Sequence, residues 1–415
     1  MRYAPVILVG RLVRFAARLR KRGGGSAVPG LVVNRIAPGF LASALDAFRD
    51  GLVIVTGSSG KSTVTKMLVA VLEAHGKRVF TNPSTANIRQ GITSALIERA
   101  SLTGRIDADI AVLEMDEGHG ALIAASLSPT TVVLTNVMTD QIDRFEDSEK
   151  VLGMLGRIAR RATGQVVSNA DDAMLEQLVG TLDNGVSTVR FGVSDQVLAA
   201  HPRGLGYART ASGRLLGGAG TVVTAVDGVA ATIVHHGQAI NVTLPARGAH
   251  YAIDAAAALS SAAVLLDSAF DPRLAGATIS ALRPVFGRGE IVEVRGKRVE
   301  FVLVQNPASF QLNLDSLPTD LDQVLVAMGS DVRDPSYFWP VETASLGRVT
   351  TVTGSKAVEM ALQFEYQDVV VDRIEPDLAR AIDDFLALPK PRHGVKTIIF
   401  TAEAMRRTRT HLALA

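Results

Sequence analysis

Cysteine is absent from the 415 residues of this chain, and its absence excludes three kinds of chemistry. The chain can form no disulfide, bind no metal through thiolates and use no cysteine as a nucleophile. A large excess of one charge is also lacking, because the formal net charge is only +2, so nothing draws the whole chain to nucleic acid. No apolar stretch reaches the roughly 18 uncharged residues of a membrane-spanning helix. We therefore expect a cytoplasmic location and no nucleic-acid partner.

The one local excess of charge lies within residues 1–45, which we expect to be a basic helix and a lead-in. Six of its basic residues crowd the helix-like part: Arg11, Arg14, Arg18, Arg20, Lys21 and Arg22. Arginines interrupt the apolar run and no small-residue cleavage site follows, which argues against a secretory signal peptide. Two interpretations stay open: a surface helix with solvated arginines, and a helix that contacts the inner face of an anionic membrane.

Short buried strands alternate with helices beyond this lead-in, which predicts a parallel sheet covered on both faces. We assign residues 46–285 to this central α/β domain and expect a small β-rich insertion at about 180–245. Residues 286–415 are expected to form a second, Rossmann-like α/β domain. Apolar runs predict strands at residues 52–55, 77–80, 110–113, 131–134, 301–304, 323–327, 348–353 and 397–400, and helices at residues 63–75 and 252–266.

A glycine-rich loop joins the first of these strands to the first long helix. It reads Thr56-Gly57-Ser58-Ser59-Gly60-Lys61-Ser62-Thr63. Backbone N–H groups of such a loop, at a helix N-terminus, attract phosphate through partial charge and hydrogen bonds. Lys61 would reach the terminal phosphates of ATP, and the Ser62 hydroxyl would hold Mg²⁺. The alternative is a serine-rich turn without a ligand, but the strand before and the helix after favour the nucleotide.

The short spacing of this loop is similar to that of Mur ligases and folylpolyglutamate synthases, and the resemblance to Mur ligases spans nearly the whole chain. It implies that Glu114, at a strand end, binds Mg²⁺, for which carboxylate oxygens are suited. Residues 135–145, which include Asn136 on the nucleotide side, resemble the T-N-L-x-x-D-Q-L-D-R-Y segment of the MurT family. Gln141 favours that family, because most other Mur enzymes carry histidine there.

Further matches follow on both sides of the expected domain boundary. Phe286-Gly287-Arg288-Gly289-Glu290 resembles the F-G-R-G-E of the MurT family, which implies that Arg288 approaches the ATP phosphates from the domain junction. The role of Glu290 stays open between structure and function. Residues 353–362 resemble a C-terminal domain that ordinary Mur ligases lack. Asn82 and Asn87 are similar to a substrate-facing loop, with turn-forming asparagines as the alternative.

The chain also departs from the family. Typical MurT proteins carry a zinc ribbon built on four cysteines, which this chain cannot form, so we expect no structural zinc. Gln305 replaces a lysine of the family. Tyr251 and Asp254 replace two asparagines of the usual nucleotide-side motif, so adenine contacts are not transferred to them.

The resemblance implies an ATP-dependent amidation. A carboxylate is activated as an acyl phosphate, and Lys61, Arg288 and Mg²⁺ offset the charge that develops. In MurT proteins ammonia then converts the D-glutamate α-carboxylate of lipid II to D-isoglutamine. A GatD-type glutamine amidotransferase partner, which contributes the cysteine and the histidine, supplies the ammonia.

The MurT family also contributes a carboxylate that orients the histidine of this partner. Asp334 falls on that position, with Asp331 as the fallback and a simple turn cap as the alternative. Two other functions stay open. One is a Mur-type ligase that joins an amino acid or ammonia to another carboxylate, and the other is a scaffold without catalysis.

Overall fold

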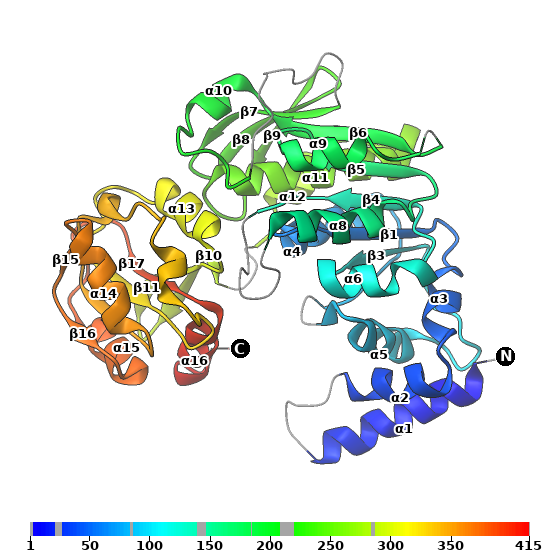
Figure 1. The fold of residues 1–415 in the computed structure, drawn as a ribbon, viewed down its shortest axis with the longest axis horizontal. Helices are drawn as coiled ribbons and strands as arrows, with labels where there is room; N and C mark the ends of the chain where they lie inside the picture. The colour runs from blue at the N-terminus through cyan, green and yellow to red at the C-terminus, as the bar shows by residue number, and fades with distance from the viewer. Residues whose placement is uncertain are drawn as a thin grey trace.

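The computed structural model describes residues 3–20, 27–83, 86–138, 147–183, 185–207, 220–283 and 287–414. A large sheet carries helices on both faces, a second α/β body lies beside it, and two helices from the start of the chain lie at the far end of the molecule (Figure 1). This arrangement confirms the expected α/β class.

The larger sheet runs in the order β2-β3-β1-β4-β5-β6-β7-β8-β9 within the described residues. All neighbours from β2 to β7 are parallel, and β7, β8 and β9 form an antiparallel meander at one edge. The strands are β1 (Leu52–Thr56), β2 (Val79–Thr81), β3 (Ile110–Glu114), β4 (Thr131–Leu134), β5 (Gln165–Asn169), β6 (Ser187–Val193), β7 (Thr221–Asp227), β8 (Ala230–His235) and β9 (Gln238–Thr243).

Alternate side chains of β1 point into two different cores, as the two-residue period of a strand requires. Val53 and Val55 pack into the core beneath α4, α11 and α12, whereas Leu52 and Ile54 pack into the core beneath α5, α6, α8 and α9. The helices are α4 (Lys61–Ala74), α5 (Arg89–Arg99), α6 (Glu117–Ile123), α8 (Ser148–Ala159), α9 (Ala173–Val179), α10 (Asp195–Ala199), α11 (Ala249–Leu266) and α12 (Pro272–Ser280), with short 3₁₀ turns η2 (Ala124–Ser126) and η3 (Asp267–Ala269).

Helix α11 is the one stretch of the described residues (Ala249–Ala269, with η3) that is long and apolar enough to cross a membrane. Most of it is buried between the sheet and α4, and its run of alanines allows this close packing. It is therefore a core helix of the fold.

The segment expected to be a β-rich insertion, about 180–245, contributes β6 to β9. These strands continue the main sheet, because β6 pairs in parallel with both β5 and β7. The proposed division between residues 285 and 286 lies outside the described residues, and the domain limits remain a proposal.

The second body contains a sheet in the order β10-β11-β17-β12-β14-β16, parallel except for the β10–β11 hairpin. The stretch 348–353, expected to be one strand, is two: β13 pairs with β15 in a separate ribbon, and β14 pairs with β12 in the sheet of the second body. The elements are β10 (Arg288–Val294), β11 (Lys297–Leu303), α13 (Pro307–Ser316), β12 (Val324–Ala327), η4 (Pro335–Phe338), η5 (Ala344–Leu346), β13 (Arg348–Val349), β14 (Thr351–Thr353), α14 (Ala357–Tyr366), β15 (Val370–Val371), β16 (Ile374–Glu375), α15 (Leu378–Ala387), β17 (Lys396–Phe400) and α16 (Ala402–His411).

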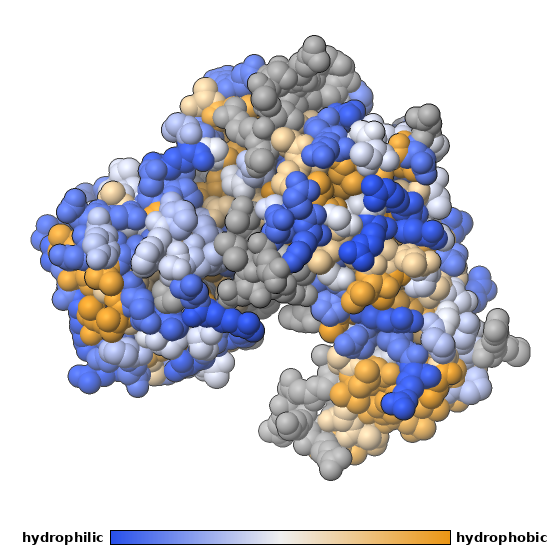
Figure 2. All heavy atoms as spheres, viewed as in Figure 1, coloured by the Kyte–Doolittle hydropathy of each residue, from blue (hydrophilic) through white to orange (hydrophobic). Residues whose placement is uncertain are grey.

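Three helices precede the first strand: α1 (Ala4–Arg20), α2 (Val28–Ile36) and α3 (Phe40–Leu45). Helices α1 and α2 pack on one another and on α5, and an apolar surface extends over them (Figure 2). The contact between α2 and α5 is close at Gly30, where a Cβ would lie 1.8 Å from the carbonyl oxygen of Gln90.

This close contact makes Gly30→Ala a test of the packing of the N-terminal helices. We expect it to destabilise the protein by about 1–3 kcal/mol, because the clash is with backbone that cannot rotate away. The matched control is Gly153→Ala in the exposed part of α8, where a Cβ meets nothing within 4 Å. It should be neutral or stabilise by about 0.5–1 kcal/mol. Urea denaturation measures both variants, and equal effects would contradict the packing.

Candidate active site

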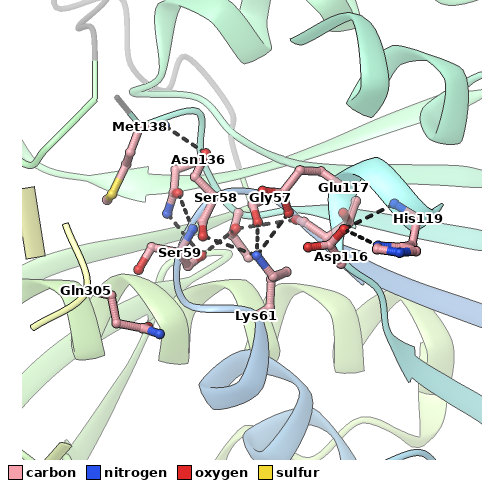
Figure 3. Close-up of polar contacts among 12 residues, drawn as sticks. Gly57, Ser58, Ser59, Lys61, Asp116, Glu117, His119, Asn136, Met138 and Gln305 are labelled. Carbon is pink, nitrogen blue, oxygen red and sulfur yellow. Dashed lines mark hydrogen bonds and ion pairs between the residues drawn. The ribbon is translucent and has the colours of Figure 1, made fainter. Parts of the chain in front are cut away.

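The residues that follow β4 hold the loop between β1 and α4 in one conformation through hydrogen bonds (Figure 3). The backbone amide of Ser58 donates to the carbonyl oxygen of Asn136 at 2.9 Å, and the amide of Ser59 donates to the Asn136 side chain, also at 2.9 Å. The Thr135 hydroxyl donates to the carbonyl oxygen of Ser59 at 2.6 Å. Because β1 and β4 are parallel neighbours, the loops at their carboxyl ends meet at one edge of the sheet.

Two glycines of the loop have left-handed backbone conformations that no other residue adopts easily. Gly57 has φ +134°, and a Cβ there would lie 2.2 Å from the Thr135 hydroxyl oxygen. Gly60 has φ +82°, and a Cβ there would lie 2.2 Å from the carboxylate of Asp254. At Gly57 and Gly60 the loop backbone therefore lies directly against its neighbours. Gly60, which has no side chain, joins the loop to the N-terminus of α4.

Lys61, the first residue of α4, turns its ammonium group back over the loop (Figure 3). It donates to the carbonyl oxygens of Gly57 and Ser58 and forms an ion pair with Glu117 at 3.1 Å. Glu117 is 2% exposed and opens α6. The sequence analysis did not select Glu117; a carboxylate three residues after Glu114, in the turn at the end of β3, was the signal that could have identified it.

Glu114 ends β3 and is held there by Asn82. The Asn82 side chain accepts from the Glu114 backbone amide and donates to the Glu114 carbonyl oxygen, both at 3.0 Å. The carboxylate accepts hydrogen bonds from Ser62 and Asn87, and burial raises its pKa, with these donors and the charges of Lys61 and Arg288 acting in the opposite direction. The structure thus brings together the two expected Mg²⁺ ligands, Ser62 and Glu114. Asn82, expected in a substrate-facing loop, contacts the backbone of Glu114, and its predicted role toward the substrate stays a prediction.

Arg288 reaches this loop from the second body. Its guanidinium lies 3.4 Å from the Thr63 hydroxyl on one side and 3.4 Å from the Gln305 side-chain oxygen on the other. Glu290, two residues further, accepts from the backbone amide of Gly287 and pairs with Arg409 of α16, so its contacts are structural.

A pocket opens between the two bodies beside the loop, and its lining includes Ser59, Gly60, Thr63, Asn136, Arg288 and Gln305. His250, Tyr251 and Asp254, from the start of α11, complete its inner wall. Burial lowers the pKa of His250 to about 4, and the nearby charges of Arg288 and His201 act in the same direction. Burial raises the pKa of Asp254 well above its ordinary value, although Arg288 and a hydrogen bond with Thr63 oppose this. Burial therefore favours the uncharged form of both side chains.

A second buried carboxylate fixes the segment behind the loop. Asp172 caps α9 and accepts from the backbone amide of Val137 at 2.6 Å. Burial raises its pKa to about 6. Asp172 therefore supports the segment that contains Asn136 from behind the loop. The residues from Thr139 to Phe145 of the MurT-like segment, with Gln141, lie outside the described residues.

Asp334 lies in the second body and is exposed. Its side chain accepts from the backbone amide of Ser336 at 3.0 Å and caps η4, and hydrogen bonds from Ser336 lower its pKa. Asp331, the fallback, accepts from the Thr401 hydroxyl at 2.7 Å and from the Glu403 amide at 2.9 Å. Both carboxylate oxygens of Asp331 therefore accept hydrogen bonds from residues at the start of α16, whereas the Asp334 side chain is exposed to solvent.

Comparison with known proteins agrees with this geometry. The Mur ligase middle domain matches residues 55–262, half of the chain and the whole of the phosphate loop. The chain belongs to the Mur ligase family. It is accordingly an ATP-dependent amide ligase of peptidoglycan synthesis. The MurT ligase C-terminal domain also matches, over residues 303–405.

Individual Mur ligases extend this likeness. The MurT subunit of the glutamine-hydrolysing lipid II isoglutaminyl synthase of Streptococcus pneumoniae is 28% identical over 367 residues, which cover 81% of this chain and 79% of that protein. The fold is similar to MurF from Acinetobacter baumannii, at a TM-score of 0.69 and 16% identity over 91% of this chain and 80% of that one. It is also similar to MurF from Thermotoga maritima in complex with ADP, at a TM-score of 0.66 and 19% identity over 94% of this chain and 83% of that one.

The residues of the site fit the nucleotide and the metal that Mur ligases use. Gly57 and Gly60 leave the loop backbone bare, and the buried Nδ1 atom of His250 in the pocket has no hydrogen-bond partner within the described part of the chain. Such an unpartnered polar atom in a pocket is suited to a ligand. Ser62 and Glu114 provide a hydroxyl and a carboxylate within hydrogen-bond distance of each other, the hard oxygen ligands that Mg²⁺ takes.

Replacing Lys61 tests whether this loop binds the nucleotide. We expect Lys61→Ala to abolish ATP-dependent product formation and leave the fold intact, because the ammonium group is the one cation of the loop itself. Turnover and circular dichroism should be measured on the same sample. Wild-type turnover in a well-folded variant would refute the assignment.

Asp254 predicts a pH-dependent stability. A carboxyl whose pKa is raised in the folded state holds its proton while the unfolded chain loses it, so its contribution to stability falls as pH rises above about 4. Asp254→Asn removes this loss. We expect the variant to match the wild type near pH 4 and to gain up to about 1.4 kcal/mol per pH unit above it, until the folded-state pKa is reached. Melting temperatures from pH 4 to 8 measure the difference. A constant difference would show that Asp254 is ionised in the folded protein.

Proposed function

We propose that this Mur ligase amidates the α-carboxylate of D-glutamate in the peptide stem of lipid II, using ATP and ammonia released by a GatD-type glutaminase subunit. The reaction would take place in the cytoplasm at the inner face of the membrane. The observation that carries the proposal is the junction at which Arg288 of the MurT-type second body reaches the phosphate loop at Thr63.

The first half of the reaction follows from the charges around the loop. Lys61 contacts the loop at Ser58 and Arg288 reaches it at Thr63, so the transferring phosphoryl group would lie near two cations. Mg²⁺, held by Ser62 and Glu114, would supply further positive charge when bound. The substrate carboxylate attacks the terminal phosphate of ATP, and an acyl phosphate and ADP result. Residues of both bodies line the pocket, so this intermediate would form at their junction.

The second half of the reaction needs ammonia, which is scarce at neutral pH because ammonium predominates. The chain has no cysteine with which to release ammonia from glutamine. A partner subunit with such a nucleophile supplies it, in line with the two-subunit enzyme named for the Streptococcus pneumoniae relative.

A surface for this partner lies beside Asp334. Helix α14 carries an exposed apolar stripe at intervals of four residues, and with Trp339 after η4 it forms an apolar face (Figure 2). This α14 face consists of Trp339, Val358, Leu362 and Tyr366. Helix α14 is attached to η4 by a hydrogen bond from Gln363 to the carbonyl oxygen of Phe338 at 2.7 Å. An exposed carboxylate next to an apolar face suits a residue that completes a triad across an interface.

Product mass tests the proposed substrate. The chain with ATP, Mg²⁺, lipid II and concentrated ammonium chloride should give the mass change of a carboxyl converted to a carboxamide, and tandem mass spectrometry should place it on D-glutamate. A parallel reaction with a mixture of free amino acids is the comparison. An amino-acid adduct, or no product from lipid II, would move the assignment to another Mur-type ligase.

Asp334 separates the two-subunit enzyme from a stand-alone ligase. We expect Asp334→Asn to reduce glutamine-dependent amidation by up to about 10⁴-fold, because an amide cannot stabilise the imidazolium of the partner's histidine. Amidation with ammonium chloride at mildly alkaline pH should persist, since the loop around Lys61 is untouched. Asp320→Asn, an exposed carboxylate of the same body, is the control and should change neither activity.

The outcome of both assays decides the role of Asp334. Loss of both activities would assign Asp334 to the fold or the ligase centre. Loss of neither would make it a turn cap only.

A further inference from the structure

Helices α1 and α2 present a continuous row of large apolar side chains to solvent. On α1 these recur at intervals of four, three and four residues, which places them on one side of the helix. This N-terminal apolar face consists of Leu8, Leu12, Phe15 and Leu19 of α1 and Val28, Leu31 and Ile36 of α2. Phe15 is 66% exposed and Leu19 is 76% exposed. Figure 2 shows the apolar surface over these two helices, at the end of the molecule opposite the second body.

The opposite side of α1 packs against α5, so the apolar face points away from the protein. Ile7 is fully buried, and a Cβ on Gly10 would already lie 3.0 Å from Ile97 of α5. Arg11 donates to the carbonyl oxygens of Ile97 and Ala100, and Arg14 forms an ion pair with Glu98 at 2.5 Å. Large apolar side chains held outward together mark a binding surface.

The charged residues of the segment that carries this face are all of one sign. Residues 1–45 contain eight arginines and lysines and no aspartate or glutamate, although the whole chain carries a formal net charge of only +2. Arg35 of α2 is exposed between Leu31 and Ile36. An apolar face with basic residues only is typical of a helix that lies in the interface of an anionic bilayer.

The α14 face offers an internal contrast. There, Glu359 and Glu365 interrupt the apolar stripe and Lys356 precedes it, so charges of both signs surround it. Anionic lipid would be repelled by those carboxylates, whereas a protein can pair with them. Charge therefore distinguishes the two exposed apolar faces.

We propose that the N-terminal apolar face binds the surface of an anionic phospholipid bilayer, with its apolar side chains among the upper acyl groups and its basic residues at the phosphates. This binding does not depend on the proposed substrate. It would hold the enzyme where a lipid-linked substrate is found.

Sedimentation with vesicles tests the proposal. The full chain is mixed with vesicles of phosphatidylglycerol and phosphatidylcholine, or of phosphatidylcholine alone. We expect binding to the anionic vesicles, weaker binding at high salt, and little binding to the neutral ones. Leu12→Glu with Phe15→Glu should lower the bound fraction about tenfold or more, because both charges enter the apolar face.

The matched control changes the other face: Leu362→Glu with Tyr366→Glu should leave vesicle binding unchanged. Circular dichroism checks each variant, and Leu12→Ser with Phe15→Ser replaces the glutamate variant if that one fails to fold. Equal binding of variant and wild type, or equal binding to neutral vesicles, would overturn the proposal. The proposal would also be overturned if the wild type did not bind vesicles but formed a homodimer, or a complex with the glutaminase, that Leu12→Glu with Phe15→Glu disrupted. The vesicles contain no lipid II, so this result and that of the amidation assay are independent.

Discussion

The amide hydrogen bonds from Ser58 and Ser59 to Asn136 are the interaction on which the rest of the site depends. They hold in one conformation a loop that its two glycines would otherwise leave flexible. The hydrogen bonds are possible because β1 and β4 are parallel neighbours, so the chain after one strand meets the chain after the other. Asp172 then holds the Asn136 segment through the Val137 amide, so the loop is supported by a second layer of hydrogen bonds.

Arg288 adds a second body to this arrangement. In the proposed reaction the nucleotide site would be complete only when that body lies against the central sheet, because Arg288 is provided from outside the loop. Three ion pairs among the described residues accompany the contact: Arg203 with Asp315 at 2.6 Å and with Glu342 at 3.0 Å, and Arg247 with the buried Glu300. Phosphate binding and the relative position of the two bodies are therefore linked through charged side chains.

Much of the fold and of the site could be predicted from the sequence. Short apolar runs ending at a glycine loop predicted β1, α4 and their junction, because burial on both faces and phosphate binding each impose a local pattern. Arg288 could be placed only through a family resemblance, since its contact with Thr63 spans more than two hundred residues. Glu117 and the clamp of Asn82 on Glu114 were missed because they depend on which strands become neighbours. The division of 348–353 into two strands depended in the same way on tertiary pairing.

The ion pair between Lys61 and Glu117 makes the enzyme compete with its own ligand. In the proposed reaction a phosphate at the loop would take the ammonium group from Glu117, which is 2% exposed. A buried carboxylate that loses its cation raises the free energy of the occupied state, so the loop would bind phosphate less tightly than the cations alone would allow. The same carboxylate would recover Lys61 when the products depart. An internal anion of this kind would shorten the residence time of ADP and phosphate and favour repeated turnover over tight binding.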